Sequence, residues 1–488
     1  MKKTASIIVT LLGLWGVSTY MIGNQTQNEL EKYINKSNKI YADKGIALKL
    51  TDYKHSFLDS TAQIEVDFKD PEIIKVLSED YKLPLKITYN IEHGPLFFKN
   101  GFGIGLEKID NRLLISSLLK DNAKKEFLKI LKDDINLKTA MIVSFDKQLN
   151  YTIESDKIDI DQDNKQLSMT PLKIEGTTDI ENFKGNGKVN IQKVTFKEDN
   201  SSDGVELDNL AVDVSIDEII KETLLFGDFK FSIAKVLIKD SNNPNLKEIN
   251  FAINGLMSNR KVTKDIMDST FKASINLANT KLDKVFKDLE RINIGADMKN
   301  LGIEGMYEFQ NVAKTIQDER VKLVENIQNQ NQEEMRVTFA KLNSLDEKMI
   351  KKILPTLNKL LIKDKTNLSY SVDIDTKDKK STKANIKIGY TGDIDFNKDI
   401  KKLTEEIKAK LLSTISLNVD INLNKKHLSM LPIPMLEQQL QMGVAQGFIK
   451  DNNSSYILNG YYKNRELMVN DNNLTSTVLP LLMMFTAH

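Results

Sequence analysis

Ile415-Ser-Leu-Asn-Val-Asp-Ile-Asn-Leu423 alternates apolar and polar residues without a break. Successive side chains of a β-strand point to opposite faces of a sheet, so this period of two predicts a strand with one apolar and one polar face. Similar alternation fills much of the region from Leu137 to Gly305, and one example is Leu210, Val212, Val214 and Ile216. Because turns rich in Asn, Asp and Gly separate these strands, we predict a large, elongated, mostly antiparallel sheet.

Four segments have helical spacing, with apolar residues three or four positions apart. They predict helices over Asn28–Lys44, Asn111–Asp133 and Pro434–Ile449, and a helical hairpin over Tyr307–Lys363 whose turn is the polar break Asn329–Gln332. The expected fold class is therefore α+β, with amphipathic helices between the strands. The apolar face of the sheet must be covered by helices, by a second sheet or by a ligand, and periodicity does not say which.

Lys2 and Lys3 precede a long apolar segment, Ser6 to Gly23, at the start of the chain. Its length suits one membrane-spanning helix, which needs roughly 20 apolar residues. The two lysines favour a cytoplasmic N-terminus, so the rest of the chain is expected on the far side of the membrane. The alternative is a cleaved signal peptide, which usually has a shorter apolar region and an A-x-A-like site, and Thr19–Asn24 has no such pattern. We predict a retained anchor.

The composition of the 488 residues fits a folded body on one anchor, since 40% are hydrophobic. The net charge is +1, from 69 basic and 68 acidic residues, and no basic stripe points to nucleic acid. The absence of cysteine excludes disulfides and thiolate metal sites. We predict a membrane anchor at 1–27, a strand-rich region at 28–305, a helical hairpin at 306–363 and a strand-helix-strand region at 364–488 that packs on the same body.

His93 attracts attention as a candidate for chemistry because it follows Glu92 and precedes Gly94 and Pro95. A histidine that is oriented by a carboxylate can serve as a general base. Adjacent residues of a strand point to opposite faces, however, so Glu92 is poorly placed as its partner, and no G-x-S-x-G nucleophile motif accompanies the pair. We interpret His93, Gly94 and Pro95 as a structural turn in which Gly and Pro set the backbone dihedrals, and we predict no catalytic residue.

Two other patterns match ligand sites only in part. Asp159-Ile-Asp-Gln-Asp163 suggests a calcium loop, but the positions that require Gly and a bidentate Glu hold Asn164 and Thr170. Gly101-Phe-Gly-Ile-Gly105 follows a turn and opens no helix, so it is not a phosphate-binding loop. The four histidines include no i, i+4 pair for zinc. We predict neither a metal site nor a cofactor.

Several short motifs occur in order along the chain. They are the N-terminal anchor, Tyr53-Lys-His-Ser-Phe-Leu-Asp-Ser60, the turn Ile91-Glu-His-Gly-Pro95, a long β region, a helical pair ending near Leu354-Pro355, and a C-terminal helix followed by Tyr-x-Asn-x-x-Leu-x-Val-Asn at Tyr462–Asn470. With this order the chain resembles the YdgA-like family of Gram-negative bacteria, the domain of unknown function 945. It departs from the family at Asn464-Arg465 and Asn470-Asp471, where the family tends to have Gly and Asn-Gly.

The resemblance implies a single-pass protein of the bacterial inner membrane, with its N-terminus in the cytoplasm and its body in the periplasm. By analogy with AsmA-like envelope proteins, whose extended sheet forms an apolar groove for acyl chains, we expect a non-enzymatic role in envelope maintenance or lipid handling. The expected partners are the membrane, lipid and envelope proteins. Two alternatives stay open: a structural envelope protein that self-associates as a homo-oligomer, and an envelope hydrolase with a non-standard site.

Overall fold

The computed structural model describes residues 26–41, 45–56, 59–94, 96–97, 99, 101–131, 133–162, 164–198, 203–221, 224–241, 248–277, 288–325, 332–392, 394–398, 402–403, 410, 413–430 and 435–476. Nearly all of the predicted anchor, residues 1–27, lies outside this set. Within it, no helix is both long enough and apolar enough to cross a membrane. The chain divides into two compact units: unit 1 is Met1–Asn254 with Asn279–Lys281, and unit 2 is Gly255–Ala278 with Leu282–His488.

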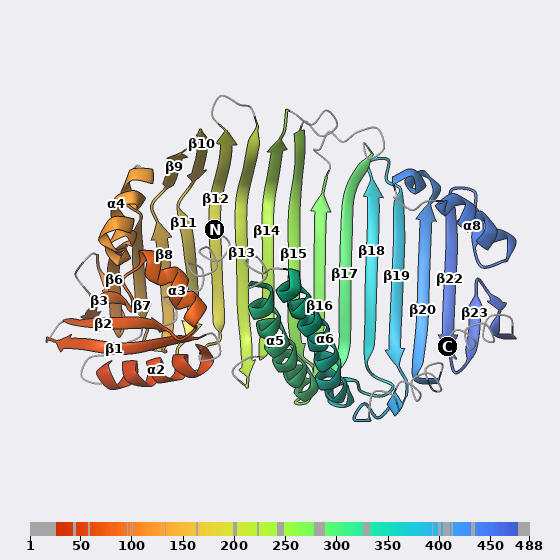
Figure 1. Cartoon of the computed structure of the whole chain (residues 1–488), viewed down its shortest axis with the longest axis horizontal. Helices are drawn as coiled ribbons and strands as arrows, with labels where there is room; N and C mark the ends of the chain where they lie inside the picture. The colour runs from red at the N-terminus through yellow and green to blue at the C-terminus, as the bar shows by residue number, and fades with distance from the viewer. Residues whose placement is uncertain are drawn as a thin grey trace. The chain divides into compact units, whose positions relative to one another are not determined.

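Unit 1 contains a long antiparallel sheet in which most strands pair with their neighbours in sequence (Figure 1). The order is β1 (Ile46–His55), β2 (Asp59–Phe68), β3 (Leu85–His93), β6 (Glu107–Leu114), β7 (Asn136–Val143), β8 (Gln148–Ser155), β11 (Leu172–Asp179), β12 (Gly185–Glu198), β13 (Gly204–Ile220) and β14 (Leu224–Lys239). The short strands β9 (Ile158–Gln162) and β10 (Lys165–Met169) pair with each other, and β10 also pairs with β12. A small ribbon, β4 (Leu96–Phe97) with β5 (Gly103–Ile104), connects β3 to β6.

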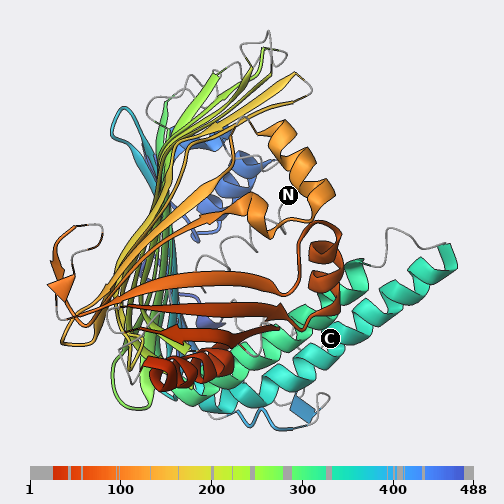
Figure 2. The same ribbon diagram turned by 90° about the vertical axis from the view of Figure 1, so that its left-hand side faces the viewer.

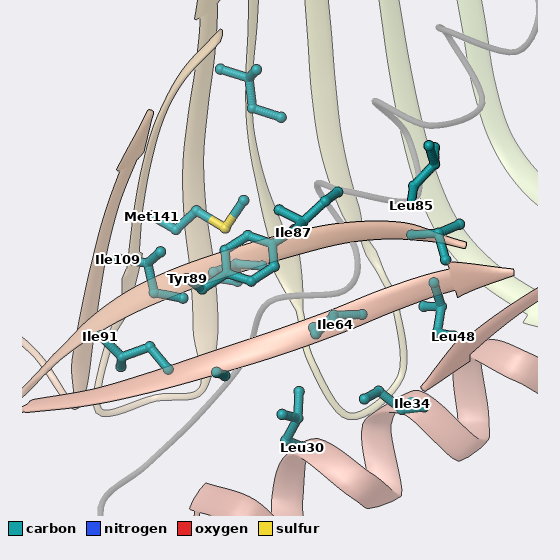
Figure 3. Packing of buried hydrophobic residues seen from close by; sticks show 14 of the residues in the cluster. Leu30, Ile34, Leu48, Ile64, Leu85, Ile87, Tyr89, Ile91, Ile109 and Met141 are labelled. Carbon is teal, nitrogen blue, oxygen red and sulfur yellow. The ribbon is translucent and has the colours of Figure 1, made fainter. Parts of the chain in front are cut away.

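The packed core of unit 1 lies where β1–β3 and β6–β8 meet the helices α2 (Thr26–Tyr41) and α3 (Pro71–Asp80). Along β2 every second residue is buried, as alternation requires: Ala62, Ile64, Val66 and Phe68. Figure 3 shows Leu30 and Ile34 of α2 below the strands that carry Ile64 and Tyr89. Helix α2 therefore covers the apolar face at this end of the sheet.

The side chain of Asn38 joins α2 to the backbone of β1. The Asn38 Nδ2 group donates a hydrogen bond to the Leu48 carbonyl at 2.9 Å, and Asn38 Oδ1 accepts one from the Leu48 N–H at 2.7 Å. On its other side β1 pairs with β2. The amide of Asn38 thus satisfies both backbone groups of Leu48 that point away from the sheet.

Unit 2 also consists of antiparallel strands with helices. Its strand order is β16 (Ile266–Asn276), β17 (Leu289–Gly302), β18 (Asn367–Thr376), β19 (Ser381–Tyr390), β20 (Ile415–Asn424), β22 (Ser455–Lys463), β23 (Glu466–Val469) and β24 (Asn472–Asn473), with β21 (Lys450–Asn452) pairing with β22. The boundary between the two units falls within β15 (Glu248–Lys261).

Helices α5 (Ile303–Glu325) and α6 (Gln332–Leu360) form an antiparallel hairpin in unit 2. The Lys348 ammonium lies 2.7 Å from both carboxylate oxygens of Glu319 across the pair. At the other end, a Cβ on Gly305 would lie 2.2 Å from the backbone nitrogen of Leu360. Glycine at that position is what lets the two helices meet so closely.

The structure confirms a large antiparallel sheet with interspersed helices. It also confirms the predicted helices near 28–44 and 434–449, which are α2 and α8 (Leu436–Ala445), and the hairpin within 307–363. The predicted helix over Asn111–Asp133 is wrong at its start, because Asn111–Leu114 continues β6 and pairs with β7; the helix α4 spans only Asp121–Ile130. Pairing with a neighbouring strand overrides local helical spacing there. Helix α3 was not predicted. The division of the chain into regions 1–27, 28–305, 306–363 and 364–488 stays a prediction.

The difference in burial between two isoleucines predicts different losses of stability when each is replaced by alanine. Ile64 is 1% exposed in the core of unit 1, whereas Ile294 on β17 is 46% exposed. We expect Ile64→Ala to lower the free energy of unfolding by about 2–5 kcal/mol, because the cavity adds to the lost burial. Ile294→Ala should cost under about 1 kcal/mol. Urea titrations of the two variants and the parent protein measure both values, and equal losses would contradict this assignment of the core.

Candidate functional site

His93 lies in a buried polar chain at the end of β3. Its Nε2 atom is 2.7 Å from Ser60 Oγ on β2, and the Tyr53 hydroxyl is 2.9 Å from the same Ser60 oxygen. On the other side of the ring, His93 Nδ1 is 3.8 Å from Glu107 Oε1 on β6. Ser60, His93 and Glu107 are all buried. The antiparallel register sets this contact, since His93 stands directly opposite Glu107.

The carboxylate partner of His93 is therefore Glu107, and Glu92 faces away. Glu92 Oε1 accepts a hydrogen bond from the Lys99 backbone N–H at 3.1 Å. Serine, histidine and glutamate in a row are the residue types of a hydrolase triad, but a nucleophile also needs access to substrate and donors for an oxyanion. Ser60 is only 3% exposed, and its hydroxyl lies between Tyr53 and His93. The hydrogen bonds of Ser60 with Tyr53 and His93 support a structural role for these buried groups.

Gly94 has a specific steric role in the turn that follows His93. Its N–H donates to the Leu106 carbonyl at 2.6 Å, and a Cβ at this position would lie 1.8 Å from the Gly105 carbonyl oxygen. Any side chain would collide with backbone there, so the close approach requires glycine. Pro95 lies outside the described residues. Gly103 and Gly105 serve packing too, since a Cβ on Gly103 would be 3.2 Å from the buried Phe97 ring and one on Gly105 would be 2.7 Å from the Val143 carbonyl oxygen.

The aspartates of the 159–163 segment do not converge on a metal site. Asp159 and Asp161 lie on β9, Asp159 pairs with Lys157 at 2.9 Å, and Asp163 lies outside the described residues. Among the residues that the structure describes, no group of three or more His, Asp or Glu side chains is placed to hold a metal ion.

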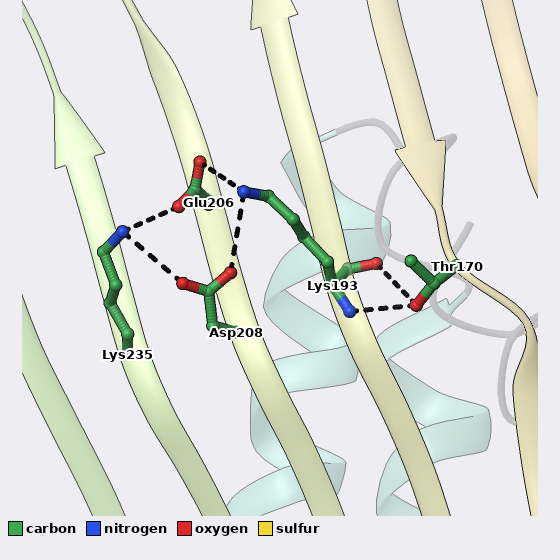
Figure 4. Close-up of polar contacts among 5 residues, drawn as sticks. All are labelled: Thr170, Lys193, Glu206, Asp208 and Lys235. Atoms are coloured by element: carbon green, nitrogen blue, oxygen red, sulfur yellow. Dashed lines mark hydrogen bonds and ion pairs between the residues drawn. The ribbon is translucent and has the colours of Figure 1, made fainter.

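Charges of opposite sign alternate across β12, β13 and β14 of unit 1. Figure 4 shows Lys193 and Lys235 on either side of Glu206 and Asp208. Lys235 Nζ is 2.7 Å from Glu206 Oε1, and Lys193 Nζ is 3.0 Å from Glu206 Oε2. These hydrogen bonds, first from Lys235 and then from Lys193, lower the pKa of Glu206 from 4.5 to about 2.

A hollow of about 670 Å³ opens on the same unit, and its walls carry a similar ladder. Cross-strand pairing sets Glu175, Lys188, Asp213 and Lys230 side by side in alternating sign. Neighbouring charges compensate one another both in this ladder and in the one around Glu206. Neither ladder therefore presents a net charge of one sign that would recruit an ionic ligand.

One side of the strands in unit 2 carries an apolar surface that is open to solvent. Register places Phe271, Ala296, Tyr370, Ile386 and Val419 in one row across β16 to β20, and Ile294 with Val372 in the next row. Five of these side chains are between 37 and 51% exposed, and we call them the open apolar face: Phe271, Ile294, Tyr370, Val372 and Ile386. At about 4.8 Å per strand, the row from β16 to β20 is roughly 19 Å long.

Unit 1 has a related surface on β12 to β14, beyond its packed core. Register aligns Val189 with Val212 and Phe231, and Gly187 with Val214 and Phe229. These apolar side chains are half-buried or exposed, in contrast to the fully buried residues of β2 and β3. Alternation in the sequence predicted which residues share a face. It carried no signal that part of that face stays accessible.

A comparison with protein families finds one match, to the family described as a bacterial protein of unknown function (DUF945), over residues 1–476. Searches of curated proteins and of solved structures return no significant match.

The shifted pKa of Glu206 predicts a pH-dependent stability. Because its folded-state pKa of about 2 is below the ordinary 4.5, the stabilisation is present above pH 4.5 and is lost as the pH falls through 2. Glu206→Gln should therefore unfold more easily than the parent at pH 7, and the difference should shrink as the pH falls from 4.5 towards 2. Urea titrations over that range test this, with Glu126→Gln on the exposed side of α4 as the control. A constant difference would refute it.

Proposed function

Because the chain belongs to the DUF945 family of bacterial proteins of unknown function, we propose a role from its surface: it is a non-enzymatic, membrane-anchored protein that binds lipid acyl chains on its open apolar face. The observation that carries the proposal is the exposure of Phe271, Ile294, Tyr370, Val372 and Ile386 in continuous cross-strand rows. Soluble surfaces rarely leave such rows uncovered unless they bind an apolar partner.

Lipid suits this surface in chemistry and in form. The rows contain aliphatic and aromatic side chains, and no charged residue interrupts them between Phe271 and Val419. Full burial of one large apolar side chain is worth about 1.5–3 kcal/mol, so covering five half-exposed ones offers roughly 5 kcal/mol in total. A row roughly 19 Å long along the sheet suits an extended chain better than a compact ligand.

The anchor is the second part of the proposal. Lys2, Lys3 and the apolar segment from Ser6 to Gly23 support a retained span with the body on the periplasmic side of a bacterial inner membrane. Such an anchor would hold the apolar face near a source of lipid. Envelope maintenance by lipid handling then follows as the cellular role.

A self-associating envelope protein is the competing function, and α6 provides the observation in its favour. Val337, Phe339 and Ile350 are each about half exposed on that helix. A second copy could cover them, or cover the open apolar face itself. Chemical cross-linking separates the two functions, because lipid binding requires no second copy.

Adjacent residues of β19 give a matched test of lipid binding. Ile386 belongs to the open apolar face, and Asn385 is exposed on the opposite side of the same strand. Ile386→Asp should reduce co-purifying phospholipid roughly tenfold or more, because an acyl chain would bury the new carboxylate. Asn385→Asp should leave the lipid content unchanged. The measurement is lipid extraction and mass spectrometry on the protein from Gln25 onward, purified without detergent.

Two results would count against the proposal. One is a parent protein that is soluble and free of lipid, and the other is an equal lipid content in Ile386→Asp and Asn385→Asp. A lipid-free protein that cross-links as a dimer would move self-association to first place.

A further inference from the structure

A separate apolar surface lies at one end of unit 1, on the β4–β5 ribbon and the turn between β7 and β8. Four side chains there are between 45 and 70% exposed, and we call them the apolar tip: Leu96, Phe102, Ile104 and Phe145. In Figure 2 the ribbon stands away from the main sheet of unit 1, at the left of the view.

The ribbon has two faces, and the exposed one is apolar. Leu96 stands opposite Ile104, and Phe97 stands opposite Gly103. Phe97 is fully buried beneath the ribbon, and Gly103 leaves room for its ring. A ribbon whose outer face meets only water would carry polar residues there, as the outer faces of antiparallel sheets commonly do. Leucine and isoleucine on the outer face indicate contact with something apolar.

Backbone hydrogen bonds hold the ribbon and the β7–β8 turn together. Gly94 N–H donates to the Leu106 carbonyl at 2.6 Å, and Leu106 N–H donates to the Val143 carbonyl at 2.7 Å. Phe145 follows Val143 by two residues, in a turn closed by the Lys147 N–H and the Ser144 carbonyl at 3.0 Å. The apolar side chains of the tip therefore form one structured surface.

The start of the described chain lies at the same end of unit 1. The Lys36 ammonium of α2 donates to the Glu181 carbonyl, and Glu181 forms an ion pair with Lys147 beside the β7–β8 turn. Tyr33 of α2 packs on Phe183, with ring centroids 5.6 Å apart. Helix α2 begins at Thr26, only three residues after Gly23.

We propose that the apolar tip rests in the interfacial layer of the bilayer that holds the anchor. This inference builds on the proposed anchor and adds how unit 1 meets the membrane. Phe102 and Phe145 would insert at the level of the headgroups and first acyl carbons, where aromatic and aliphatic side chains bind favourably. Lys99 and Lys147 flank the tip and are already ion-paired with Asp59 and Glu181, so the proposed contact rests on the apolar side chains.

Site-specific fluorescence on the full chain tests this contact. The chain has no cysteine, so Phe102→Cys and Phe145→Cys each provide one attachment point for an environment-sensitive dye. Leu114→Cys is the control within unit 1, because Leu114 is 48% exposed and lies at the end of β6 away from the tip. Each labelled protein is reconstituted into phosphatidylcholine–phosphatidylglycerol liposomes with or without lipids that carry a quencher near the headgroup.

We expect quenching of roughly twofold or more at positions 102 and 145, and almost none at 114. Because both substituted residues are exposed, failure of one variant to fold leaves the other as the test. An alkaline wash of the liposomes separates the two proposals. Protein that is retained while both dyes stay unquenched overturns the tip contact alone, and protein that washes off overturns the anchor and the tip with it. A dye response that depends on protein concentration and not on the quencher would assign the tip to a second copy, and would also overturn the inference.

Discussion

Each strand of this protein hydrogen-bonds to its neighbours through the backbone, and that ladder forces alternate side chains onto one face of the sheet. The apolar face that results must be covered by other elements or stay exposed to solvent. In unit 1, α2 and α3 pack over β1 to β3, and residues such as Ile64 and Tyr89 are sealed from water. In unit 2 the α5–α6 hairpin meets β17 at its end, and the rows through Tyr370 and Ile386 stay accessible. The difference in covering, more than the strands themselves, distinguishes a packed core from an accessible apolar surface.

Two histidines that enter the interior contact polar side chains of neighbouring elements. His93 connects Ser60 to Glu107 across three strands, and His427 contacts the Thr382 hydroxyl in the same manner at 2.8 Å. Burial lowers the pKa of His427, which favours the neutral ring in that setting. These histidines contact side chains of neighbouring elements. Their residue type alone would suggest catalysis, but their burial does not favour it.

Local sequence patterns predicted most helices and strands. They did not predict which strands pair or which side chains meet across them. The alternation of Ile415–Leu423 became β20, and helical spacing located α2, α8 and the α5–α6 hairpin. Sequence neighbours made Glu92 the visible partner of His93, whereas the actual one, Glu107, lies across a strand pairing that local spacing does not encode. The same limit explains why Asn111–Leu114 looked helical. The open apolar face was predictable as a set of residues, but its exposure depends on where the helices pack, which is a property of the whole fold.

The amide of Asn38 has a consequence for the behaviour of the sheet in a crowded compartment. A strand at the side of a sheet offers unpaired N–H and C=O groups that can template the growth of aggregates. At Leu48 those groups are already occupied by a side chain of α2, which also shields the strand sterically. Helix α2 thus hinders the pairing of another strand with β1 at Leu48, which would otherwise favour fibrous aggregation. This effect is additional to its packing in the core.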